Sequence, residues 1–469
     1  MRTCSRSAVL LLLAVVILAP LGHSQQKLLA PTPPMGWNSW DSYGLTITES
    51  QFQANVDVLA ARLKPLGYQY AVVDEGWYLA NPEAANHPQT LQYRIDANGR
   101  YLPATNRFAS AAGTVGFQSL ADYVHARGLK FGIHIIRGIS KQAVAANLPV
   151  ANSSFHAADL ADTSDTCPWN PDNFGVKDNP AGQAWYDALL QQYAAWGVDY
   201  IKVDCIAAHP YKGDEIRMIH RAIQRSGRPI VLSLSPGPAP LDKASEVAAN
   251  AQVWRISDDV WDRWLRPADQ HFPQGVKNQF AIIASWAPQV RPGNWPDADM
   301  LPLGTLGPVP GYGQPRTTTL THDEQRTLVT LWSIARSPLF MGGNLTQLDD
   351  WTAALISNPD VLAMDQQGHD QRLASPPPDP MDNPASDPST DQSDGLIAWT
   401  SNGDHGRQYL ALFNTTNSPM RFVVPLRRYG FTADKYAARD LWEHKDLGKI
   451  AEATAALPPH AVLLLELRH

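Results

Sequence analysis

Residues 196–205 of this 469-residue chain read WGVDYIKVDC, and they decide the fold class. An amphipathic helical pattern over Ala184–Trp196 precedes them and ends at Gly197. The run Tyr200–Asp204 is short and rich in β-branched residues, which is typical of a parallel strand covered on both faces. It ends on a carboxylate, so this helix–strand unit also predicts a site.

The same arrangement recurs along the chain from about residue 25 to residue 370. Capping boxes at Thr48 with Gln51 and at Thr321 with Glu324 predict the starts of two further helices. Repeated β–α units predict an α/β fold, a (β/α)₈ barrel. A doubly wound open sheet is the alternative, but no glycine-rich phosphate motif follows the first strand. The candidate strands are Tyr70–Asp74, Lys130–Ile136, Tyr200–Asp204, Ile230–Ser235 and Val253–Ser257.

The two ends of the chain differ from the barrel region. Residues 1–24 carry Arg2 and Arg6 before a short apolar run, which predicts a cleaved signal peptide and export to the periplasm or the extracellular space. A retained anchor is the weaker alternative. Residues 371–394 are rich in Pro, Asp and Ser and predict a linker or loop. Residues 395–469 alternate short strands with turns and predict a small antiparallel β-sandwich domain.

Composition limits the class of partner. The net charge of −7 argues against nucleic acid and against an anionic membrane surface. The 15 Trp residues suit carbohydrate binding, although most tryptophans in a globular protein belong to its core. We therefore expect a carbohydrate partner, with no membrane association once the signal peptide is removed.

Carboxylates and cations gather at the predicted strand ends. In a (β/α)₈ barrel these ends face one pocket, and paired carboxylates there suit glycoside hydrolysis. A divalent-metal site is the competing interpretation, but no HxH or HExxH spacing supports it. A Ser–His–Asp hydrolase is weaker still, because the chain has no GxSxG motif. The residues concerned are Asp74, Glu75, His134, Lys202, Asp204, Arg255 and Asp259.

Several motifs resemble those of glycoside hydrolase family 27, the melibiases. They occur in the family's order along the whole predicted barrel. They are Pro33–Trp40, Asp74–Trp77, Lys202–Asp204, Trp254–Asp259, Pro292–Met300 and Ser337–Met341.

The resemblance implies a retaining mechanism with Asp204 as nucleophile and Asp259, rather than Asp258, as acid/base. It also implies that Asp74 and Glu75 hold sugar hydroxyls at the far end of the pocket. Lys202 would bind a ring hydroxyl, Arg255 would lie at the 2-substituent and Trp40 would line the sugar face. No metal or organic cofactor is expected.

Three positions depart from the α-galactosidase pattern. Glu75 replaces an Asp and, being one methylene longer, narrows the region of the sugar's C6 group. His134 stands in place of a Tyr, and Ser235 in place of a Glu. The leading expectation is release of terminal α-D-galactosyl residues from oligosaccharides or polysaccharides. The alternative is a β-L-arabinopyranosidase, whose sugar lacks the C6 arm; less favoured are an α-N-acetylgalactosaminidase and an inactive carbohydrate-binding homologue.

The cysteines also depart from the family pattern, which ties the loop after the third strand to the residue just past the nucleophile. Here Cys205 comes one residue earlier than usual, and Cys167 lies further along that loop. A Cys167–Cys205 disulfide is nevertheless expected, because signal cleavage removes Cys4 and leaves only these two.

Overall fold

The computed structural model describes residues 28–113, 116–374 and 395–469. The predicted signal peptide and most of the predicted linker lie outside these residues. Within them, no helix is both long enough and apolar enough to cross a bilayer.

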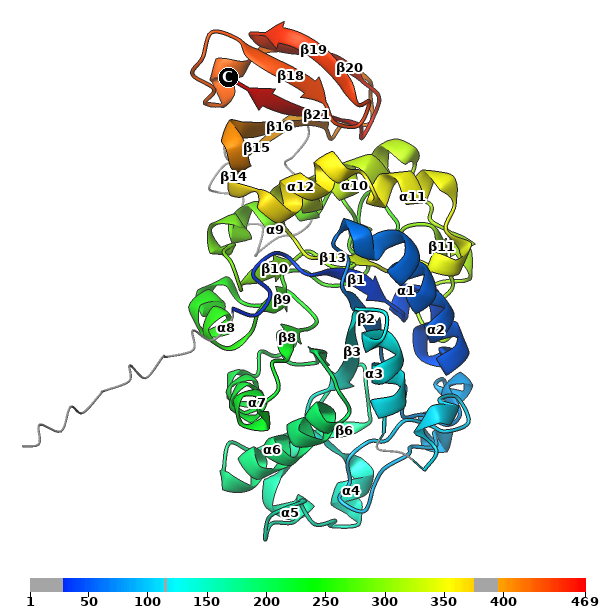
Figure 1. The fold of residues 1–469 in the computed structure, drawn as a ribbon. Helices are drawn as coiled ribbons and strands as arrows, with labels where there is room; N and C mark the ends of the chain where they lie inside the picture. Colours follow the sequence, from blue (N-terminus) through cyan, green and yellow to red (C-terminus); the bar gives the residue numbers. More distant parts are fainter. Residues whose placement is uncertain (1–27, 114–115, 375–394) are drawn as a thin grey trace, which may run out of the picture.

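A (β/α)₈ barrel forms the larger part of the molecule, as the sequence predicted (Figure 1). Neighbouring strands in its sheet are parallel, and Leu301 closes the ring through a parallel bridge to Met341. In spatial order the strands are β10 (Trp295–Asp297), β9 (Val253–Arg255), β8 (Val231–Leu234), β7 (Tyr200–Asp204), β3 (Lys130–Ile136), β2 (Tyr70–Val73), β1 (Met35–Asn38) and β13 (Leu339–Met341). The sequence indicated five of them. It did not indicate β1, β10 and β13, which read MGWN, WPD and LFM and lack the β-branched residues that marked the other strands.

Helices follow the strands and cover the outside of the barrel. Both predicted capping boxes are confirmed at the first turns of α2 and α10, and the helix before Gly197 is α6. The longer helices are α2 (Glu49–Val58), α3 (Gln118–His125), α6 (Pro180–Ala195), α7 (Gly213–Ser226), α8 (Ala244–Asn250), α9 (Gln279–Trp286), α10 (His322–Ala335), α11 (Asp350–Ile356) and α12 (Pro359–Gln367). Shorter elements are α1 (Trp40–Tyr43), α4 (Lys141–Ala145), α5 (Ala157–Leu160), β11 (Thr305–Leu306) and β12 (Arg316–Thr317).

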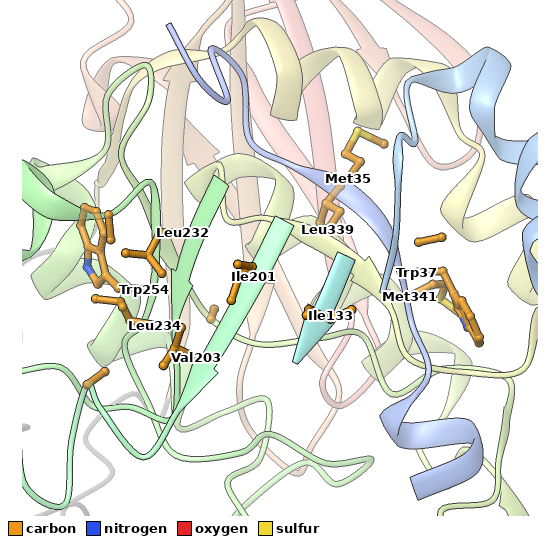
Figure 2. Packing of buried hydrophobic residues seen from close by; sticks show 14 of the residues in the cluster. Met35, Trp37, Ile133, Ile201, Val203, Leu232, Leu234, Trp254, Leu339 and Met341 are labelled. Atoms are coloured by element: carbon orange, nitrogen blue, oxygen red, sulfur yellow. The ribbon is translucent and has the colours of Figure 1, made fainter. Parts of the chain in front are cut away.

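Alternate residues of each strand face the helices and the barrel interior, because strand side chains have a period of two. Figure 2 shows outward-facing side chains such as Ile201, Val203 and Leu232 packed in the layer beneath the helices. Tyr200, which directly precedes Ile201, belongs to a separate cluster inside the barrel. Lys202 and Asp204 lie on the same face of β7 as Tyr200. Because Ile201 and Val203 pack against the helices outside the barrel, Lys202 and Asp204 point into the barrel.

A small sheet follows β3 and carries the loop that matters most for the site. It consists of β4 (Ile139–Ser140), β5 (Ala161–Thr166) and β6 (Asn173–Val176) in the order β4-β6-β5. Residues 167–172 connect β5 to β6.

The C-terminal domain is an antiparallel β structure with its own apolar core, as predicted. It begins at β14, directly after α12, so residues 371–373 of the predicted linker belong to a strand. Phe413 of this domain packs edge-on against Phe280 of the barrel, with ring centroids 5.0 Å apart. One sheet runs β14 (His369–Leu373), β15 (Leu396–Asn402), β16 (Arg407–Asn414), β21 (Val462–Arg468), β18 (Tyr436–Asp440) and β19 (Lys445–Ile450); the other pairs β17 (Met420–Pro425) with β20 (Glu452–Leu457).

Candidate active site

A cavity of about 570 Å³ opens at the carboxyl ends of the barrel strands. Most of the residues singled out from the sequence line it. His134 and Arg255 do not; each contacts a carboxylate that does. The lining residues are Trp40, Asp41, Asp74, Glu75, Pro168, Trp169, Lys202, Asp204, His209, Ser235, Pro236, Asp258, Asp259, Val260, Trp261, His271, Phe272, Asp299 and Met300.

Asp204, the last residue of β7, is held ionised by its surroundings. Its Oδ2 lies 3.2 Å from Nε2 of the buried His134, which belongs to the neighbouring strand β3. Burial raises the pKa of Asp204, but the hydrogen bond and charge of His134, together with Lys202, outweigh burial and leave the pKa below its usual value. An anionic carboxylate at the floor of a cavity is suited to nucleophilic attack.

Asp74 and Lys202 form a second charged pair beside Asp204. The Lys202 ammonium donates to Asp74 Oδ2 at 3.0 Å, and Asn38 Nδ2 donates to the same oxygen at 2.7 Å. Burial raises the pKa of Asp74, but the charges of Lys202 and His134 outweigh it and bring the pKa to about 2. Two fixed, oppositely charged groups on a cavity wall are suited to holding sugar hydroxyls.

Asp259 and its neighbour Asp258 have different partners. Arg255 Nη1 lies 3.2 Å from Asp259 Oδ1, while Arg255 Nη2 lies 2.7 Å from the buried Asp299. Asp258 instead contacts His209 Nε2 at 2.9 Å. The Asp259 side chain is 40% exposed, so it can exchange protons with solvent and reach the oxygen of a leaving group.

Glu75 follows Asp74 at the end of β2 and is fixed from outside the barrel. Asn170, in the loop between β5 and β6, donates to Glu75 Oε1 at 2.6 Å. Burial raises the pKa of Glu75 to about 7; the charge of His134 opposes that rise, and the charge of Asp204 adds to it. The protonated form of Glu75 is therefore favoured up to a higher pH than that of an ordinary glutamate.

The Glu75 carboxylate lies beside the candidate nucleophile. One ligand atom each from Glu75, His134 and Asp204 lies within 4.8 Å of the others. This closeness arises because β2 and β7 both flank β3, so their polar ends converge near His134. These three residues could hold a cation, but His134 already hydrogen-bonds to Asp204 and the Lys202 ammonium lies nearby. That Asp74 and Glu75 hold sugar hydroxyls at the far end of the pocket stays a prediction.

The predicted disulfide between Cys167 and Cys205 is confirmed. It joins the loop after β5 to the residue that follows Asp204. Arg137 supports the same loop: its guanidinium donates to Asp165 in β5 at 2.8 Å and to the Cys205 carbonyl at 2.6 Å. The loop thereby brings Trp169 to the cavity and Asn170 to Glu75.

Several cavity residues escaped the sequence analysis. Asp299 lies within the motif Pro292–Met300, and Asp41 directly follows Trp40. Their positions next to residues already singled out could have identified both from the sequence. Irregular loops carry His209, Trp261 and Phe272. In such loops no periodic pattern predicts which way a side chain points.

Comparison with known proteins agrees with this geometry. Residues 32–172 and 173–367 match the family model described as alpha galactosidase A, and residues 393–467 match that of the alpha galactosidase C-terminal beta sandwich domain.

Individual relatives carry different specificities. A family 27 β-L-arabinopyranosidase from Geobacillus stearothermophilus is 43% identical, with a TM-score of 0.84 over 94% of this chain and 97% of that chain. An α-galactosidase from Oryza sativa subsp. japonica is 26% identical over 92% of this chain and 84% of its own length. An α-N-acetylgalactosaminidase from Gallus gallus is 28% identical over 72% of this chain and 71% of its own length.

Proposed function

Because the chain belongs to glycoside hydrolase family 27, the melibiases, and is a glycosidase of that family, we propose that it is a retaining β-L-arabinopyranosidase. In this proposal it releases terminal β-L-arabinopyranosyl residues from oligosaccharides or polysaccharides. The α-D-galactosidase activity favoured from sequence becomes the second candidate, supported by the α-galactosidase relatives.

The observation that carries the proposal is the position of Glu75. Asn170 fixes its carboxylate within the cavity, where the longer side chain takes room that a shorter Asp would leave free. β-L-Arabinopyranose matches α-D-galactopyranose except for the missing C6 hydroxymethyl group, so it fits the narrower pocket. The 43% identical relative is itself a β-L-arabinopyranosidase, which supports the same order of preference.

The mechanism assigns one role to each carboxylate. Asp204 attacks the anomeric carbon and forms a glycosyl ester, while Asp259 gives its proton to the departing oxygen. Asp259 then removes a proton from the water that hydrolyses the ester, so configuration is retained. Asp74 and Lys202 hold ring hydroxyls throughout. Arg255 supports Asp259 when it carries negative charge.

Parallel assays of aryl β-L-arabinopyranoside, α-D-galactoside and α-N-acetylgalactosaminide test the proposal. We expect kcat/KM to be highest for the arabinopyranoside. The galactoside should be slower by about 10- to 200-fold, the range that one small group in a pocket commonly gives. A higher kcat/KM on either of the other two substrates would overturn the proposed specificity. No turnover of any, with sugar binding retained, would favour an inactive binding protein.

Export through a cleaved signal peptide is a second part of the proposal. The Arg residues and apolar run of residues 1–24 support it, and the Cys167–Cys205 disulfide fits an oxidising compartment. Mass spectrometry of the protein recovered from the native host tests it; a retained Met1 in the mature protein would contradict cleavage.

A further inference from the structure

The cavity is larger than one bound sugar ring needs, and its lining falls into two groups. The charged residues at the strand ends form the first group. The second comes from loops outside the barrel: Trp169 follows β5, His209 follows β7, and Asp258 and Phe272 follow β9. We propose that Trp169, His209, Asp258 and Phe272 form an aglycone site, which binds the leaving group and selects a sugar there. This inference rests on the proposed glycosidase mechanism. It assigns a binding site to the part of the substrate that leaves when the glycosidic bond breaks.

Two aromatic side chains give the aglycone site its walls. Trp169 is 44% exposed and Phe272 is 43% exposed, and no other Trp or Phe in the described part of the chain is classed as exposed. Exposing a large aromatic side chain forgoes the free energy of its burial. Both exposed rings line the same cavity. A ligand whose apolar CH faces cover the two rings would explain this arrangement.

The walls rest on a rigid base. Phe272 packs edge-on against Tyr312 at 5.2 Å between ring centroids, and Tyr312 packs against the buried Trp261 at 4.8 Å. The backbone at Trp169 is anchored by the Cys167–Cys205 disulfide, two residues from its own position. Neither ring therefore has to be ordered when a ligand binds, which reduces the entropic cost of binding.

A polar pair lines the same cavity. His209 Nε2 lies 2.9 Å from Asp258 Oδ1, and the His209 ring meets Trp169 edge-on at 6.2 Å. The His209 side chain is 48% exposed, which leaves it accessible to a ligand hydroxyl. Aromatic faces that share a cavity with an imidazole–carboxylate pair match a pyranose, which has both CH faces and hydroxyls, better than a purely apolar alcohol.

The aglycone site is also connected to both candidate catalytic residues. Asp258 directly precedes Asp259, and Cys205, which anchors the Trp169 loop, directly follows Asp204. A sugar bound in the aglycone site would thus present its glycosidic oxygen next to the proposed proton donor. The site should therefore act on kcat/KM for disaccharides rather than on the chemistry of the first sugar.

The test compares leaving groups that do and do not reach the aglycone site. For each variant, kcat/KM is measured on melibiose, on a β-L-arabinopyranosyl disaccharide, on hexyl glycosides and on the glycosyl fluorides of both sugars. A fluoride ion is too small to contact the loops. The variants are Trp169→Ala, Phe272→Ala, His209→Ala and Asp258→Asn, with Leu265→Ala as the control. Leu265 is 44% exposed and lies on the same loop as Phe272, but it does not line the cavity.

We expect the disaccharide-to-fluoride ratio of kcat/KM to fall at least tenfold in Trp169→Ala and Asp258→Asn, and to stay at the wild-type value in Leu265→Ala. An unchanged ratio in these two aglycone-site variants would overturn the inference. If the hexyl glycosides lose as much as the disaccharides, the site accepts apolar alcohols and its assignment to a sugar is wrong. If the wild-type protein hydrolyses neither fluoride, the proposed function itself fails, which is a distinct result.

Discussion

Asn170 Nδ2 donates a 2.6 Å hydrogen bond to Glu75 Oε1 and so joins a loop outside the barrel to a residue at the end of a barrel strand. The backbone N–H of Asp172 donates in turn to Asn170 Oδ1 at 2.9 Å, which fixes the orientation of the amide. The position of the Glu75 side chain is thus set jointly by the strand that precedes it and by the disulfide-bonded loop that holds it.

Shortening Glu75 should widen the pocket. In Glu75→Asp, kcat/KM for α-D-galactosides should rise relative to β-L-arabinopyranosides by about 10- to 200-fold, since room for one small group is restored. Glu83→Asp is the matched control, because Glu83 is exposed on a loop outside the cavity and should leave the ratio unchanged. A ratio that does not move in Glu75→Asp would refute the steric account.

Glu75 should also make stability depend on pH. Its pKa is about 7 in the folded protein against an ordinary value of 4.5, so the folded state binds the proton more tightly. The stabilisation is complete below the ordinary value and is lost as the pH rises through about 7. Glu75→Gln avoids this loss.

The Tm of Glu75→Gln relative to the wild type should therefore be higher at about pH 8 than at about pH 5. Calorimetric scans at both values measure it, with the exposed Glu83→Gln as control. Equal differences at the two pH values would show that the Glu75 carboxyl titrates in its ordinary range.

Substitutions of the two proposed catalytic carboxylates should differ in how their effect depends on the leaving group. Asp204→Asn removes the nucleophile and should lower kcat by on the order of a thousandfold or more on every substrate. Asp259→Asn removes the proton donor and should lower kcat/KM on disaccharides by about 10²- to 10⁴-fold. Its effect on glycosyl fluorides should be much smaller, because fluoride departs without protonation. Equal losses on both substrates would rule out Asp259 as the acid.

Loss of the disulfide should cost both stability and positioning. Replacing Cys167 and Cys205 together by Ser should lower the free energy of unfolding by about 4 kcal/mol, because the bridge joins residues 38 apart in the sequence and so closes a long loop. It should also lower kcat/KM, since the loop carries Asn170 and Trp169. Dithiothreitol should affect the wild type and not the double variant. Two reactive thiols in the denatured, unreduced chain without residues 1–24 would contradict the bridge.

Chelation should leave the activity intact. Glu75, His134 and Asp204 bring three possible ligand atoms together, but Lys202 already supplies positive charge beside them. Dialysis against EDTA is therefore expected to leave kcat/KM unchanged. An activity lost on dialysis and restored by one divalent cation would establish a metal-dependent enzyme instead.

Period-two alternation and strand ends made the catalytic half of the site predictable. Lys202 and Asp204 had to share the inward face of β7 once Ile201 and Val203 faced the helices. The same reasoning could not reach Asn170, His209 or Phe272, whose positions depend on irregular loops and long-range contacts. It also could not give the closeness of Glu75 to Asp204, because sequence order does not reveal how closely the ends of β2 and β7 converge over β3.

The position of β14 has a consequence for how this protein can be dissected. β14 precedes the Pro/Asp/Ser-rich stretch and pairs with β15, which follows it. A cut within that stretch would leave β14 on the barrel fragment and expose the edge of β15 on the other. A C-terminal domain intended for domain swaps or for fusion to another catalytic module should therefore start at about His369. In sequence order, the Pro/Asp/Ser-rich stretch falls between two paired strands of the C-terminal sheet.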